Sequence, residues 1–113
     1  MPRTPSASAA PALDPVVLRA AAGEAVAVLK ALGNPERLLL LCQISQGELS
    51  VAELEAALGI HQPTLSQQLG VLRREGLVET RRDGKNVIYR VADERVLALL
   101  QTLYALYCPK EAP

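Results

Sequence analysis

Two short helical segments joined by a tight turn constrain the fold of this sequence most. Ser50 stands three residues before Glu53, a capping-box pattern that starts a helix, and Gly59 ends that helix. A second helix is expected from Gln62 to Glu75, with one apolar stripe formed by Leu65, Leu69 and Leu72. The opposite face of this second helix is mostly polar and carries Pro63, Ser66, Gln67, Gly70 and Arg74.

A predicted β-hairpin follows this pair of helices directly. Apolar and polar residues alternate over 77–82 and 86–91, and the dipeptide Asp83-Gly84 between them is typical of a tight hairpin turn. Two short helices followed by a basic hairpin are the order of a winged helix-turn-helix. In that fold the second helix enters the major groove of DNA, and the hairpin reaches the flanking phosphates.

The residues before this unit also show helical periodicity. Apolar residues at three- and four-residue steps predict a helix from residue 13 to Gly33, with Gly23 as a point at which it can divide into two helices. Asn34 and Pro35 are typical of a helix cap and a first helical turn. A buried helix is therefore expected from there to Gly47.

The last helix is expected to begin after Asp93, which is a capping residue, and to end at Pro109. The predicted fold is mainly α, with a two-stranded wing, in a single domain over 13–108. Residues 1–12 combine three prolines with Ser and Ala and no apolar periodicity, which predicts a disordered tail. Residues 109–113 are expected to form a C-terminal tail.

The composition favours a homodimer. The 113 residues include no Trp, no Phe and three Tyr, so the core must be built from Leu, Val, Ile and Ala. Because a small aliphatic core buries little area, such domains often complete their burial across a subunit interface. We expect dimerisation through the first and last helices, with the last helix burying Leu97, Leu100, Leu103 and Tyr104.

The sequence predicts a soluble, cytoplasmic protein without a membrane partner. Its longest apolar run, around Leu38 to Leu41, is far shorter than the roughly 18 to 20 residues that span a bilayer. Arg3 is not followed by the apolar core of a secretory signal.

Charge is distributed unevenly although the net charge is zero. Residues 61–90 carry six basic and three acidic side chains, whereas the segments on either side are net acidic. A solvated charged surface is one interpretation, and contact with DNA phosphates is the other.

In the DNA interpretation, base edges are contacted by Gln62, Thr64, Ser66 and Gln67. Phosphates are contacted by Arg74, Arg81, Arg82 and Lys85, and Gly70 lets the helix backbone approach the DNA.

Enzymatic and metal-binding functions find little support in the sequence. It shows no Ser-His-Asp set, no glycine-rich phosphate loop and no carboxylate pair with an evident purpose. His61 is the single histidine, and no second ligand accompanies it, so we assign it no metal. The sequence therefore predicts neither an enzyme nor a cofactor.

Three segments resemble the ArsR-type bacterial repressors: LKALGNPERLLLLCQI, GELSVAELEAALGIHQPTLSQQLGVLRREGLVETRRDGKNVIYRV and LYALYC. The resemblance spans about Val26 to Cys108 and is nearest to the BigR, SqrR and HlyU group, whose two cysteines correspond to Cys42 and Cys108. It implies a homodimer that binds an inverted-repeat operator in double-stranded DNA when its thiols are reduced. It also implies release when reactive sulfur species, as inducers, link the thiols by a disulfide or polysulfide. Metal-sensing members carry a Cys-x-Cys pair or His and Asp ligands, and this sequence has neither.

Several alternatives stay open at the level of sequence. Free cysteine is commonly a small buried hydrophobe, and Cys42 lies among leucines. Burial raises the pKa of a thiol, and a helix C-terminus, where Cys108 lies, disfavours a thiolate. The alternatives are a repressor that responds to another oxidant or to a metal, and a winged-helix module that binds protein rather than DNA. If the thiols do link, the bond would tether the helix of Cys42 to the dimerisation helix and change the spacing of the two recognition helices.

Overall fold

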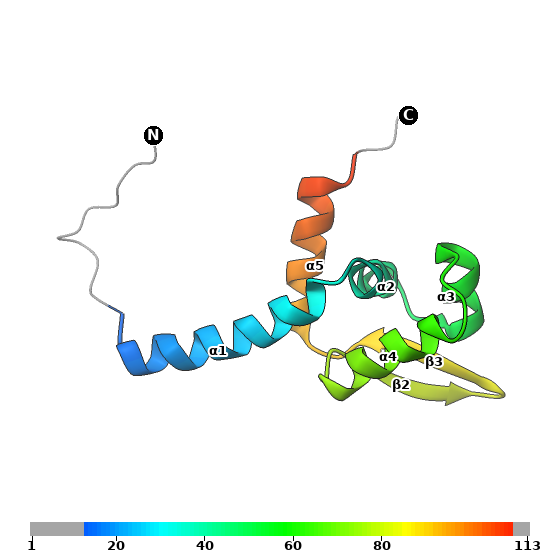
Figure 1. The fold of residues 1–113 in the computed structure, drawn as a ribbon, viewed down its shortest axis with the longest axis horizontal. Coiled ribbons are helices and arrows are strands. Elements are labelled where there is room, and N and C mark those ends of the chain that lie inside the picture. The colour runs from blue at the N-terminus through cyan, green and yellow to red at the C-terminus, as the bar shows by residue number, and fades with distance from the viewer. Residues whose placement is uncertain (1–12, 110–113) are drawn as a thin grey trace.

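The computed structural model describes residues 13–109, so the predicted tails, 1–12 and 109–113, lie outside the described residues except for Pro109. Figure 1 shows a body of short helices against a twisted sheet, from which the two longest helices project. The elements of the described range are, in order, α1 (Pro15–Leu32), α2 (Pro35–Ser45), β1 (Leu49–Ser50), α3 (Val51–Leu58), α4 (Thr64–Arg74), β2 (Val78–Asp83), β3 (Asn86–Val91) and α5 (Glu94–Tyr107). The predicted winged helix-turn-helix order is confirmed.

The first helix is continuous from Pro15 to Leu32. Asp14 accepts a hydrogen bond from the Val16 N–H at 2.9 Å, and Pro15 occupies the first turn. The helix then continues through Gly23, so the suggested division into two helices is wrong. A glycine inside a helix costs only about 1 kcal/mol relative to alanine and keeps its backbone hydrogen bonds, so it need not end the helix.

The start of α3 is fixed by a complete capping box. The Ser50 hydroxyl accepts from the Glu53 N–H at 3.1 Å, and the Glu53 carboxylate accepts from the Ser50 N–H at 2.8 Å. Ser50 is buried, so both of these polar groups need protein partners. At the other end of α3, Gly59 adopts a left-handed conformation with φ of +69°, which a residue with a Cβ disfavours.

Replacing Ser50 with alanine is expected to destabilise the protein by about 1 kcal/mol, because the Glu53 N–H loses its acceptor. The free energy of unfolding in urea measures this loss. Ser45→Ala is the matched control, since the Ser45 hydroxyl caps no helix start: it donates to the Cys42 carbonyl and accepts from the Gln46 side chain at the end of α2. Equal stability of Ser50→Ala and Ser45→Ala would contradict the role of the cap.

The sheet has three strands rather than the predicted two. Its order is β1-β3-β2 and both pairings are antiparallel, with Leu49 opposite Tyr89 and Thr80 opposite the same tyrosine. The hairpin turn contains Gly84 at φ of +64°, as the Asp83-Gly84 pattern predicts. β1 is two residues long, which is too short for any alternation of apolar and polar residues to appear in the sequence.

Leucine makes up nine of the fifteen buried apolar residues within the described range. Seven leucines from four helices have almost no exposed surface: Leu40, Leu41, Leu54, Leu65, Leu69, Leu72 and Leu100. The complete burial of Leu100 within one protomer overturns its predicted place in the dimer interface, because it has no surface left to bury against a partner. The other three predicted interface residues keep some surface, with Tyr104 exposed and Leu97 and Leu103 partly exposed.

Most of α1 lies outside this core. Its side chains are exposed from Pro15 to Ala27, and only its last turn is buried, at Ala31 and Leu32. We call the exposed part, residues 15–27, the α1 arm; Figure 1 shows it projecting from the body, as does the C-terminal end of α5. Among residues 13–109, no helix combines the length and the apolar character that a membrane crossing requires.

Candidate nucleic-acid interface and thiol pair

Helix α4 turns a polar face to solvent. Its leucines pack inward, while the opposite side carries four exposed residues and a half-exposed glycine, which we call the polar face of α4: Ser66, Gln67, Gly70, Arg73 and Arg74. Figure 1 shows α4 beside the β2–β3 hairpin on the side of the body away from the end of α5. The geometry thus leaves this face and the hairpin accessible together.

The four predicted base-contacting residues differ in their surroundings. The Gln62 side-chain oxygen accepts hydrogen bonds from both the Ser66 N–H (3.1 Å) and the Ser66 hydroxyl (2.6 Å), so Gln62 lies before α4 and caps its first turn. Thr64 is half-buried at the start of the helix. Within residues 13–109, Gln67 makes no side-chain hydrogen bond and is exposed, so its amide is available to a ligand.

The cations of the hairpin divide between its two faces. Opposed residues in the register are Arg81 with Ile88 and Arg82 with Val87, so the two arginines point to opposite sides of the sheet. Arg81 forms an ion pair with Glu48 at 3.0 Å, whereas within the described range Arg82 and Lys85 are exposed and form no ion pair. Arg82 and Lys85 are therefore the hairpin cations most available to phosphate.

Gly70 leaves open space on the polar face of α4. A Cβ placed on Gly70 would meet only the Arg74 guanidinium, with Nη1 at 3.7 Å, which is an ordinary contact. Packing inside the protomer does not require glycine here. A role of Gly70 in letting the helix backbone approach DNA stays a prediction.

One polar cluster was not predicted. Gln68 of α4 contacts both Glu36 and Arg37 at the start of α2, at distances of 3.3 Å and 3.2 Å between hydrogen-bonding atoms. The Arg37 side chain also donates to the Ala31 carbonyl at 2.9 Å. Gln68 falls at the edge of the leucine stripe of α4, and that position was the available indication that its amide faces inward.

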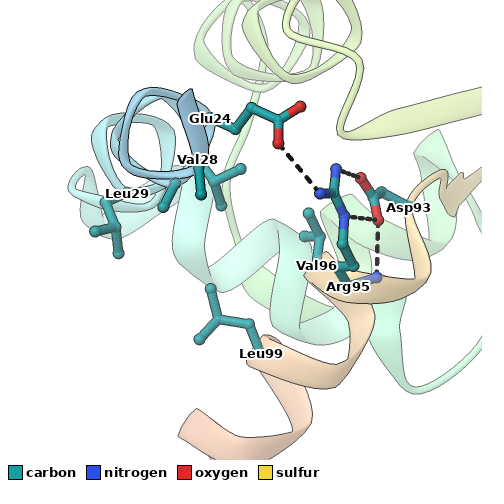
Figure 2. A pocket seen from close by; sticks show the side chains of 9 residues that line it. Glu24, Val28, Leu29, Asp93, Arg95, Val96 and Leu99 are labelled. Atoms are coloured by element: carbon teal, nitrogen blue, oxygen red, sulfur yellow. Dashed lines mark hydrogen bonds and ion pairs between the residues drawn. The ribbon is translucent and has the colours of Figure 1, made fainter. Parts of the chain in front are cut away.

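A groove of about 380 Å³ lies between the α1 arm and the first turn of α5 (Figure 2). Its walls are mainly apolar, and at its rim Arg95 pairs with Asp93 at 3.0 Å and with Glu24 at 3.5 Å. The hydrogen bond from the Arg95 side chain lowers the pKa of the Asp93 carboxyl. The Arg95 pairs are exposed, so they contribute little to stability.

The two cysteines are free and come from helices that pack together. Cys42 is half-buried on α2, and Cys108 is exposed directly after α5. Burial raises the pKa of the Cys42 thiol, and the charge of a Cys108 thiolate raises it further. The two thiols therefore lie on packed helices although 66 positions separate them in the sequence.

Cys108 is expected to react with iodoacetamide faster than Cys42 at neutral pH, because Cys42 is partly covered and its raised pKa leaves little thiolate. The rate at Cys42 should rise as the pH approaches that raised pKa. Mass spectrometry of the alkylated peptides over time measures both rates. Faster labelling of Cys42 at pH 7 would contradict this assignment.

His61 pairs with Glu55 at 2.8 Å on the surface. Within the described part of the chain, no three His, Cys, Asp or Glu side chains are grouped so that they could hold a metal ion.

Comparison with known proteins identifies the family. Residues 34–80 match the family described as bacterial regulatory protein, arsR family. The chain is 53% identical over 90 residues to the biofilm growth-associated repressor of Agrobacterium fabrum, which covers 80% of this chain and 77% of that protein. It is 45% identical over 85 residues to the transcriptional activator HlyU of Vibrio cholerae, and this match covers 75% of this chain and 79% of that protein.

Solved structures agree with these sequence relatives. The transcriptional repressor BigR from Xylella fastidiosa superposes with a TM-score of 0.78 at 45% identity, covering 87% of this chain and all of that one. A homodimeric winged helix-turn-helix DNA-binding domain from Mycobacterium bovis superposes with a TM-score of 0.68 at 36% identity. This superposition covers 78% of this chain and 82% of that one. The chain therefore belongs to the arsR family of bacterial regulatory proteins, in the group that contains BigR and HlyU.

Proposed function

We propose that this protein is a cytoplasmic, homodimeric repressor of transcription that binds an inverted-repeat operator and releases it when Cys42 and Cys108 become linked. The observation that carries the DNA-binding part is the polar face of α4, exposed beside a hairpin whose Arg82 and Lys85 have no carboxylate partner within residues 13–109. Uncharged polar side chains on a recognition helix contact base edges, and nearby cations contact phosphates. We assign the protein no catalytic role.

A homodimer explains the apolar surface that one protomer leaves exposed. On the α1 arm and the following turn the exposed apolar residues are Val16, Val17, Leu18, Val26 and Leu29, and at the end of α5 they are Tyr104, Leu106 and Tyr107. Val16 and Tyr107 are each more than three-quarters exposed, which is costly for isolated side chains of this size. A second copy that packs α1 and α5 against the same helices would cover these residues and fill the groove of Figure 2.

The proposed switch is a reaction of the two thiols with a persulfide. The Cys108 thiolate attacks the outer sulfur of RS–SH, which releases RSH and leaves a persulfide on Cys108. The Cys42 thiolate then attacks the Cys108 sulfur, which forms the Cys42–Cys108 disulfide and expels H₂S. Two thiols lose two electrons in total, and the outer sulfur of the persulfide gains them.

This bond would couple the helix-turn-helix to the dimer interface. Cys42 lies on α2, which packs against α4, whereas Cys108 ends α5, which we assign to the interface. A covalent tether between α2 and α5 would change the angle or the spacing of the two recognition helices in the dimer. Dimers of this type need those helices about 34 Å apart to reach successive major grooves, so a small change removes several contacts.

Substitutions on α4 and on the hairpin test the division between base and phosphate contacts. Gln67→Ala is expected to relax the preference at one base pair, with a loss of about 1–3 kcal/mol for the preferred site. Arg82→Ala should weaken binding to all sequences alike. Its affinity should also depend less steeply on salt concentration, by the amount expected for about one lost phosphate contact. Fluorescence anisotropy with the protein's own upstream DNA and with base-changed duplexes measures both effects.

Glu79→Ala changes the charge of the same hairpin in the opposite sense, since it removes the carboxylate that pairs with Arg90, and it should strengthen binding to all sequences alike. Equal losses from Gln67→Ala and Arg82→Ala on every sequence would refute the assigned roles. A response of the wild type to a metal or to a peroxide, but not to a persulfide, would favour the alternative inducers.

A further inference from the structure

Arg37 connects the end of α1 to the recognition helix. Its Nε donates to the Ala31 carbonyl at 2.9 Å, and Nη2 donates to the Lys30 carbonyl at 3.3 Å. Both carbonyls lie in the last turn of α1, and the Lys30 carbonyl also accepts from the Gly33 N–H at 3.2 Å. On the other side, Nη1 donates to the side-chain oxygen of Gln68 at 3.2 Å. One guanidinium therefore links α1, α2 and α4.

The Gln68 amide is engaged at both of its ends. Its oxygen accepts from Arg37, while its nitrogen donates to the Glu36 carboxylate at 3.3 Å. Glu36 and Arg37 are neighbours of opposite charge, so a single orientation of the amide satisfies both. We call this pair of contacts the Gln68 link.

The Gln68 link restrains a motion that the leucines alone permit. The remaining contact of α4 with α2 is made by apolar side chains, whose attraction has no preferred direction. Hydrogen bonds limit both distance and angle. A rotation of α4 by roughly 20° about its axis would break them and would move side-chain ends at a radius of 5–6 Å by about 2 Å.

Direct packing of α1 on α4 does not provide this restraint. A groove of about 320 Å³ separates the two helices, and Arg37 forms part of its wall together with Lys30, Val71 and Glu75. The connection from α1 to α4 at this place therefore passes through the Arg37 side chain.

We propose that Arg37 and Gln68 are positioning residues that set the rotation of α4 and thereby its discrimination between base pairs. This inference rests on the proposed function, in which the polar face of α4 contacts bases. A displacement of about 2 Å is larger than the tolerance of a bidentate contact between a glutamine and adenine. Phosphate contacts from the hairpin do not depend on this rotation, so discrimination and salt dependence should respond differently.

The test replaces Gln68 with methionine, which keeps the length of the side chain and removes both hydrogen bonds. Gln68→Met should stay folded and keep the salt dependence of the wild type. Its preference for the upstream DNA over a duplex changed at the base pair that Gln67→Ala identifies should fall about tenfold. Gln46→Met, at the exposed end of α2, is the control and should change neither quantity.

Exchange of the two partners provides a rescue. Gln68→Glu alone brings two carboxylates together and should also lose discrimination. The double variant Gln68→Glu, Glu36→Gln restores a donor opposite an acceptor at the same net charge, so it should recover most of the preference. Failure of the double variant to recover more than Gln68→Glu would contradict the proposed contacts.

A measurement without DNA separates this inference from the proposed function. Residual dipolar couplings of the reduced protein report the orientation of α4 relative to α2, and Gln68→Met should change it. Unchanged couplings together with unchanged discrimination would overturn the inference. Changed couplings in a protein whose wild type binds no DNA selectively would instead refute base contact by α4, and with it the proposed function.

Discussion

Serine in place of either cysteine is expected to leave DNA binding intact. Treatment with a persulfide should release the wild type from its operator but should release neither serine variant. Wild-type affinity for the operator should fall by a factor within the range of about 5 to 150 that is common for coupled sites. The affinities of Cys42→Ser and Cys108→Ser for the operator should each change by less than about twofold, because one thiol cannot form the intramolecular bond. Gel-shift titrations of reduced and persulfide-treated protein measure this difference.

The design of this experiment follows from the site. Serine keeps the size of cysteine, so the half-buried position on α2 is filled and the exposed position after α5 is unaffected. Adding a dithiol reductant to the treated wild type should restore binding, since the proposed bond is reversible. If both serine variants released DNA at the persulfide concentration that releases the wild type, the dithiol switch would be excluded.

The largest effect on stability is expected from Leu65→Ala. Leu65 has no exposed surface and lies on the inner side of α4, so its truncation leaves a cavity in the leucine core. Such changes cost about 2–5 kcal/mol, and small domains have only about 5–15 kcal/mol in total. We therefore expect a large drop in the urea midpoint and loss of DNA binding at 37 °C.

Leu39→Ala is the matched control for this prediction, because Leu39 is half exposed and lies on α2 outside the core. It should cost less than about 1 kcal/mol, as most surface changes do. If Leu65→Ala and Leu39→Ala were equally stable, the core would not be organised as described.

The sequence predicted those parts of the fold that rest on periodicity and caps. The leucine stripe of α4, the box formed by Ser50 and Glu53, and the turn at Gly84 each depend on residues within a few positions of one another. Local hydrogen bonds and burial determine them, and the structure places them as expected. The short strand at Leu49 was missed because pairing with Tyr89, 40 positions away, creates it.

The candidate site was predictable in its position and less so in its contacts. Alternation along β2 already implies that Arg81 and Arg82 face opposite sides, but the pairing of Arg81 with Glu48 depends on β1. Likewise the contact between Arg37 and Gln68 spans 31 positions, and no periodic pattern marks a polar pair of this kind. Gln62 is expected to contact bases, and no pattern in the sequence shows that its side-chain oxygen also accepts from Ser66.

The dimer prediction illustrates the same limit. Apolar residues of α5 recur at helical spacing along its whole length, so the sequence does not tell which of them meet the protomer's own core. The structure buries Leu100 inside and leaves Tyr107 outside, because α5 extends beyond the body of the protomer. The exposed end of α5 and the α1 arm are therefore the residues to examine for contacts between copies.

Equilibrium binding at several salt concentrations tests directly whether the polar face of α4 and the hairpin act together on DNA. We predict that the reduced protein prefers its own upstream DNA to an unrelated duplex of equal length. The logarithm of its affinity should fall linearly with the logarithm of salt concentration, by about 0.9 for each phosphate contacted. Equal affinity for both duplexes, with no dependence on salt, would contradict the account.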